Sequence, residues 1–133
     1  MRNFLTLIPV ALLAIASIFA QSADDLAKFQ PIMKAGAKAN GGVRSAIMGK
    51  DVAAAAKAAT DMSASFDSMT AYWKEKGRDD AAKFSADASA AAKAVAAATT
   101  TEDQQEAFGK ARPTCGGCHA IYRDGQKDAF KPM

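Results

Sequence analysis

Two cysteines and one histidine stand close together near the end of this chain, in the segment CGGCH. The 133-residue sequence contains no other cysteine or histidine, so Cys115, Cys118 and His119 are the complete set. On a helix, two thiols three positions apart share a face, and the imidazole follows one position later. Thiols and imidazoles bind metals, exchange disulfides and attach cofactors. This segment is therefore where the sequence predicts chemistry.

Four interpretations of CGGCH differ in what else the chain must supply. Two buried thiols, or a local disulfide in an oxidising compartment, need nothing further. A thioredoxin-like pair needs a βαβ context, and a zinc site needs four ligands where this chain has three. Cys-x-x-Cys-His is also the attachment motif of c-type haem, and this is the interpretation we favour. We expect one haem c, bound covalently through Cys115 and Cys118, with His119 on the iron.

Apolar residues recur at helical spacing in the segments that would surround this motif. They step by three or four positions through residues 52–73, 81–95 and 104–122, which predicts three amphipathic helices with both thiols facing inward. A less regular pattern at 26–47, interrupted by Pro31 and three glycines, predicts a weaker first helix. The expected fold class is all-α, an antiparallel four-helix bundle with covalently attached haem.

The connections and the small side chains add further expectations. Helix breaks are expected at 49–50, 76–77 and 99–101, with Thr101 as an N-cap, and Pro113 should kink the last helix. Alanine supplies 29 of residues 21–133. Since interiors pack to crystal-like density, a bundle lined with alanine either closes very tightly or encloses something that is not protein.

The N-terminus has the pattern of an export signal. Arg2 precedes an uncharged, largely apolar run that ends at Ala20, which is typical of a secretory signal peptide, with an uncleaved anchor as the alternative. We expect a signal peptide at 1–20, a single domain at 21–133, periplasmic localisation, and no stable membrane anchor after cleavage. The mild net charge of +3 does not suggest nucleic acid as a partner.

The residues around the motif resemble a known family, the class II cytochromes c. These proteins carry CxxCH near the C-terminus, followed by an aromatic and a basic residue, here Tyr122 and Arg123. The segment DDAAKFSADASAAAKAV, residues 79–95, also resembles the third helix of low-spin members. The resemblance covers essentially the whole of 21–133. It implies a four-helix haem protein in which Tyr122 and Arg123 tune the haem site.

The resemblance also implies a position for the second axial group of the iron. That group projects from the first helix, where QPIMKAGAKAN places Met33. With His119 and Met33 as ligands the iron is saturated, and the chain would be an electron carrier rather than an enzyme. The alternative is a five-coordinate cytochrome c′ that binds NO or CO, with Met33 as core. A helical thiol, disulfide or metal-binding module without haem is a more distant alternative.

The expected partners follow from the same resemblance. An electron carrier needs a redox partner protein. The basic residues near the motif are those expected of a solvated helix surface, and the alternative is that they steer an acidic partner; they are Lys110, Arg112, Arg123, Lys127 and Lys131. Class II proteins often form homodimers through their first two helices, and the sequence leaves monomer and homodimer open.

Overall fold

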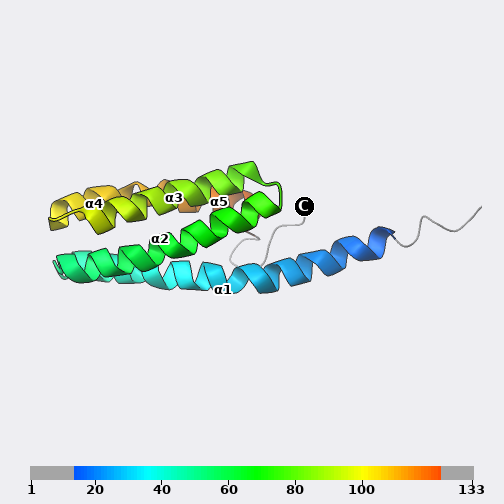
Figure 1. Ribbon diagram of the computed structural model, residues 1–133, viewed down its shortest axis with the longest axis horizontal. Helices are drawn as coiled ribbons and strands as arrows, with labels where there is room; N and C mark the ends of the chain where they lie inside the picture. The colour runs from blue at the N-terminus through cyan, green and yellow to red at the C-terminus, as the bar shows by residue number, and fades with distance from the viewer. Residues whose placement is uncertain (1–13, 124–133) are drawn as a thin grey trace, which may run out of the picture.

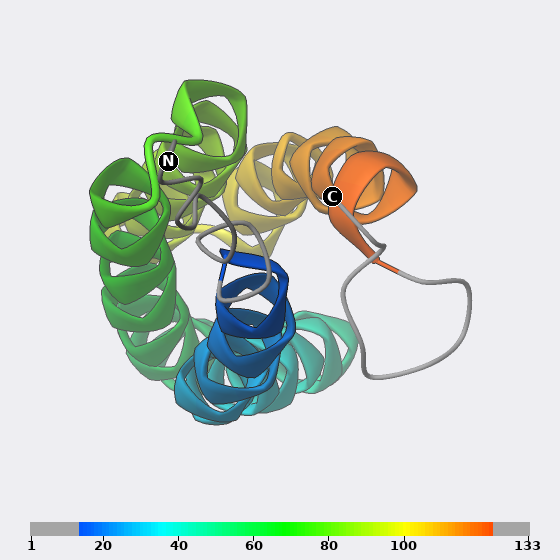
Figure 2. The same ribbon diagram turned by 90° about the vertical axis from the view of Figure 1, so that its right-hand side faces the viewer.

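The apolar faces predicted from the sequence meet across a helical bundle. The computed structural model describes the backbone of residues 14–123 and the side chains of 25–123. Five helices follow one another in this part of the chain: α1 (Ala14–Met48), α2 (Val52–Glu75), α3 (Asp79–Ala97), α4 (Thr101–Gly109) and α5 (Ala111–Tyr122). Together α4 and α5 take the fourth place in an antiparallel bundle (Figure 1; Figure 2). The predicted all-α four-helix architecture is confirmed.

Both ends of the chain lie outside this description. Most of the predicted signal peptide at 1–20 lies outside the described residues. Residues 124–133 lie outside them as well. Among residues 14–123, no helix combines the length and the apolar character that a membrane span needs.

The turns before α2 and before α3 share one backbone arrangement. In each turn one residue adopts the left-handed conformation: Lys50 at φ 56° and Gly77 at φ 68°. That residue donates its N–H to the carbonyl three positions back, and the next residue donates to the carbonyl five positions back, at 2.9–3.0 Å. This is the Schellman arrangement, which normally takes glycine at the left-handed position. The helix breaks predicted at 49–50 and 76–77 are confirmed.

The last helix begins one residue earlier than predicted and is divided in two. Thr100, not Thr101, is the N-cap of α4, and its Oγ1 accepts the N–H of Asp103 at 3.1 Å. α4 ends at Gly109 and α5 begins at Ala111. Pro113 accounts for this break, because it lacks the N–H that would bond to the Gly109 carbonyl, and its ring crowds that carbonyl. The expected kink thus appears as a one-residue break at Lys110, upstream of the motif, where the backbone stays in the right-handed helical region at φ −73° and ψ −20°.

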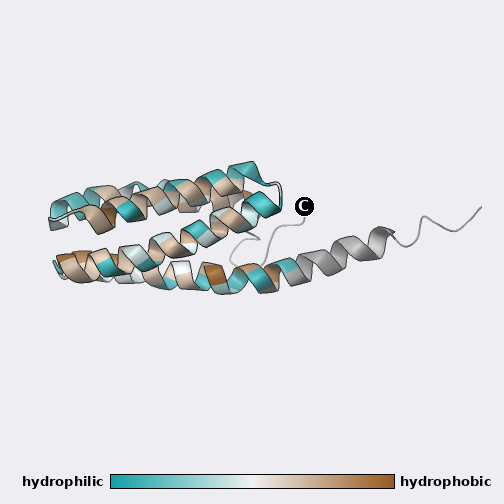
Figure 3. Cartoon of the chain, in the orientation of Figure 1, coloured by the Kyte–Doolittle hydropathy of each residue, from teal (hydrophilic) through white to brown (hydrophobic). Residues whose placement is uncertain are grey.

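Helix α2 is central to the packing, because it contacts α1 along one side and α3 along the other. The apolar face predicted for it is buried from Ala55 to Trp73. Hydrophilic residues gather at the turn between α2 and α3 (Figure 3). Most buried α3 residues are alanine or serine, so these two helices lie close together. In contrast, α1 and α5 do not pack directly on one another.

Glycines allow α1 to approach α2 closely, which explains why the helix predicted to be weak is continuous. A Cβ added at Gly36 would lie 2.9 Å from Met69 Cε, and one at Gly42 would lie 3.3 Å from Ala58 Cβ. Gly41 faces open space instead. Packing against α2 therefore compensates for the low helix propensity of glycine in this segment.

Candidate functional site

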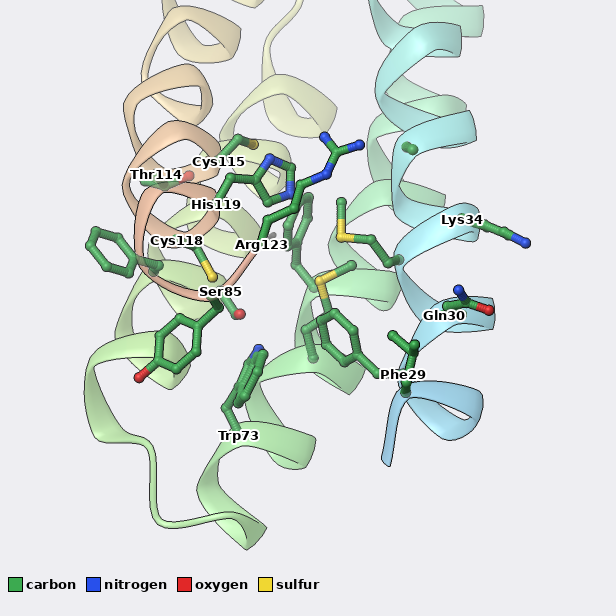
Figure 4. A pocket seen from close by; sticks show the side chains of 17 residues that line it. Phe29, Gln30, Lys34, Trp73, Ser85, Thr114, Cys115, Cys118, His119 and Arg123 are labelled. Atoms are coloured by element: carbon green, nitrogen blue, oxygen red, sulfur yellow. The ribbon is translucent and has the colours of Figure 1, made fainter. Parts of the chain in front are cut away.

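A cavity opens where α1 and α5 do not meet. Its volume is about 230 Å³, and the total empty space, including the part open to solvent, is about 1040 Å³. The sequence predicts six site residues, of which the two cysteines, the histidine and the methionine were expected to contact a cofactor directly. All six line this cavity: Met33, Cys115, Cys118, His119, Tyr122 and Arg123. Figure 4 shows side chains from α1 and α5 directed toward one another across it.

Both thiols are half-buried and lie on the cavity side of α5. Burial raises the pKa of Cys115, and it raises the pKa of Cys118 to about 11, with added effects of the Asp80 charge and of Cys115. Both groups are therefore protonated thiols at neutral pH. Reactive redox pairs have lowered thiol pKa values instead, so the thioredoxin-like interpretation is not supported by this environment.

The imidazole of His119 is suited to bind a metal ion through a nitrogen lone pair. Burial lowers its pKa, and the positive charge of Arg123 lowers it further. A neutral imidazole is the form that ligates metals. In Figure 4 the imidazole and the Arg123 guanidinium extend from α5 toward α1, side by side. Arg123 thus lines the cavity beside His119.

Met33 is the methionine that α1 contributes to the cavity. Its side chain is half-buried and packs against the core. Met69 of α2, expected to be plain core, is 2% exposed and also lines the cavity. Met62 is fully buried and does not line it, and Met48 is 74% exposed. Met33 is therefore the thioether that faces α5 from the opposite helix, although Met69 forms part of the cavity wall.

Tyr122 joins the end of α5 to the beginning of α3. Its hydroxyl donates to Asp80 Oδ1 at 2.6 Å. Burial, followed by this hydrogen bond, raises the pKa of Tyr122 to about 12, and the bond lowers the pKa of Asp80. The Tyr122 ring lies 4.8 Å from the Trp73 ring, which lies 5.1 Å from Phe29. Sequence reasoning missed Asp80, whose position in the first turn of α3 suggests only a helix-dipole role.

The second glycine of CGGCH sets how closely α5 approaches α3. A Cβ at Gly117 would lie 2.6 Å from Phe84 Cε1, so the phenyl ring rests against the backbone between the two cysteines. At Gly116 nothing lies within 4 Å. Phe84 lines the cavity as well, and its contact with Gly117 therefore positions the motif relative to the cavity wall.

The donor set at this site fits haem better than it fits a bare metal ion. Within residues 25–123 no group of three or more His, Cys, Asp or Glu side chains could hold a metal, so a zinc site lacks its fourth ligand. The cavity does bring together two thiols, a neutral imidazole and a thioether, among apolar walls.

Comparisons with known protein families, curated proteins and solved structures found no match to this chain.

Proposed function

We propose that this chain is an exported c-type cytochrome that carries single electrons through one covalently bound haem. One observation carries the proposal: Met33 of α1 lines the same cavity as Cys115, Cys118 and His119 of α5. These helices flank the cavity without packing directly on each other. A c-type haem in this cavity would be attached through the two thiols of α5, with His119 and Met33 as candidate ligands of its iron.

Each residue has a defined part in this proposal. The thiols of Cys115 and Cys118 would form the two thioether bonds, each adding its sulfur and its hydrogen across one vinyl group of the haem. His119 would supply a neutral imidazole on one side and Met33 a thioether sulfur on the other. Tyr122 and Arg123 would orient α5 and the imidazole. When bound, haem iron supplies a one-electron redox change, and a methionine ligand raises its potential relative to a second nitrogen ligand.

The wall of the cavity supports electron transfer rather than substrate chemistry. Phe29, Phe66 and Trp73 are buried, with at most 8% of each residue exposed, and they line the site together with Phe84 and Met69. An apolar wall excludes water and keeps the site rigid between oxidation states. A five-coordinate cytochrome c′ that binds NO or CO is the outcome to expect if Met33 does not ligate.

The test is a pair of methionine substitutions in protein produced with the c-type cytochrome maturation machinery. The purified chain should exceed its polypeptide mass by one haem that denaturant does not remove. The ferric form should be low-spin, with a methionine-to-iron charge-transfer band, and the ferrous form should resist CO. Met33→Ala should convert it to a high-spin, CO-binding form. A colourless protein of apo mass would refute the proposal.

Met62→Ala is the matched control, because Met62 is 0% exposed but does not line the cavity. This change should cost about 2–5 kcal/mol of stability, as for other buried Met→Ala changes, and leave the spin state unchanged. A wild-type spectrum that is already high-spin and binds CO readily would favour the gas-binding alternative.

A further inference from the structure

A second groove continues from the cavity along α1, α4 and α5. It is lined by residues from the last turns of α1, from α4 and from the start of α5, and Cys115 lines both the groove and the cavity. The groove therefore borders the edge at which the proposed haem would be attached. Any protein seated in it would approach the cofactor through Cys115.

Three basic side chains at this groove have no partner in the described part of the chain. Arg44, Lys50 and Arg112 line it and are exposed. None of them forms an ion pair or side-chain hydrogen bond among residues 25–123. Lys57, Lys76, Lys83, Lys93 and Lys110 pair with carboxylates, whereas Lys28, Lys34, Lys38 and Lys74 are also unpaired among the described residues. The groove is therefore distinguished by the three cations that gather in it, not by their lack of partners alone. Glu102 is the acidic side chain in the groove, so the surface is predominantly positive.

Lys50 occupies its place at a conformational cost. It takes the left-handed position of a Schellman turn at φ 56°, whereas Gly77 takes the equivalent position in the next turn. A Cβ in this conformation crowds the following carbonyl, which glycine avoids. The fold itself would thus accept glycine at residue 50. A lysine side chain held there against backbone preference indicates a use for its charge.

The groove also carries an exposed apolar side chain. Met48 is 74% exposed, the most exposed large hydrophobic residue among those described. It lines the groove beside Ile47 and Phe108. Methionine adapts its shape to different partners and is favoured at interfaces. A small apolar patch surrounded by unpaired charges matches a weak electron-transfer interface better than it matches a closed small-molecule site.

We propose that the groove marked by Arg44, Lys50, Met48 and Arg112 is the docking surface for an acidic redox partner protein. This inference rests on the proposed function, because it places the partner at the haem edge next to Cys115. The three cations attract and orient an acidic surface, and Met48 supplies an exposed apolar contact beside them. Three exposed cations from α1, from the turn after it and from α5 suit a protein surface rather than a small anion.

The experiment maps binding on the isotope-labelled full-length holoprotein by NMR. The probe is oxidised flavodoxin, an acidic one-electron carrier protein. Amide shifts should concentrate at residues 44–51 and 101–115, and affinity should fall about tenfold or more when ionic strength rises from about 0.01 M to about 0.1 M. Arg44→Glu combined with Arg112→Glu should weaken binding about tenfold or more. Lys50→Gly should also weaken binding while leaving the unfolding midpoint unchanged or higher.

The control is Lys57→Glu with Lys83→Glu, an equal change of charge on α2 and α3 at residues that line neither the groove nor the cavity. An equal loss of affinity in the control would overturn the proposal, since net charge alone would then explain binding. Shifts caused by hexacyanoferrate but not by flavodoxin would overturn it in favour of a small-anion site. A homodimer that the same substitutions dissociate would assign the groove to a second copy.

These outcomes are separate from those of the proposed function. A chain that carries haem but does not bind flavodoxin at the groove contradicts the docking surface alone. A chain of apo mass contradicts the proposed function.

Discussion

At the scale of single residues, the site depends on contacts that span long stretches of sequence. CGGCH is a local pattern, and it predicts the two thiols and the imidazole as site residues without a structure. The bond from Tyr122 to Asp80 joins residues 42 positions apart, so no local pattern could indicate it. A local pattern could not indicate the role of Met69 either, because its helical spacing predicts a buried side chain but not one that reaches the cavity.

The Tyr122–Asp80 bond predicts how stability changes at alkaline pH. Because the pKa of folded Tyr122 is about 12, above the value near 10 in an unfolded chain, the native state holds this proton more tightly. Its contribution is complete below about pH 10 and is lost as pH rises toward 12. Tyr122→Phe should flatten this alkaline loss, measured as the unfolding free energy in urea from neutral to alkaline pH. An unchanged pH dependence would contradict the assignment.

At the scale of elements, the helical periods predict three of the four bundle positions well. The buried faces of α2 and α3 fall where the spacing places them. The continuity of α1 through Pro31 could not be predicted, because it depends on the close approach of Gly36 and Gly42 to α2. The separation of α4 from α5 could be foreseen only as a kink at Pro113, since the break itself falls three residues earlier, at Lys110.

The two glycines of the motif provide a matched test of how α5 packs on α3. Gly117→Ala places a Cβ against Phe84 and should destabilise the fold by about 1–3 kcal/mol, as overpacking does. Gly116→Ala, which faces open space, should stabilise it by about 0.5–1 kcal/mol through helix propensity. Urea unfolding of both variants measures the difference. Equal effects at the two positions would mean that Phe84 does not constrain the motif.

At the scale of the whole molecule, α1 packs mainly on α2 and α5 packs mainly on α3, and the cavity separates these two outer helices. Both are therefore less supported than α2 and α3. The abundance of alanine indicated that the bundle would either close very tightly or enclose something that is not protein. The structure shows close packing of α2 on α3 and a cavity between α1 and α5. The sequence could not predict which two helices the cavity would separate, because every predicted helix is rich in small residues.

The cavity beside α1 predicts that this helix would open before α2 and α3 in a chain without haem. In a Cys115→Ala/Cys118→Ala variant, amide hydrogen exchange should increase more in α1 than in α2 or α3, because local opening follows the number of buried contacts. The unfolding midpoint should also fall below that of the holoprotein. Hydrogen exchange detected by mass spectrometry measures all three helices in one experiment. Equal protection of α1 in the variant and the holoprotein would contradict the proposed filling of the cavity.

The separation of α1 from α5 has a consequence for how the protein would retain its stability on dilution. A ligand held only by contacts stabilises its protein to a degree set by its free concentration, and dilution removes that support. A cofactor joined to Cys115 and Cys118, as proposed, could not be diluted away, so it would fill the space between α1 and α5 permanently. The two thioether bonds would thus make the stability of this bundle independent of the concentration of free haem.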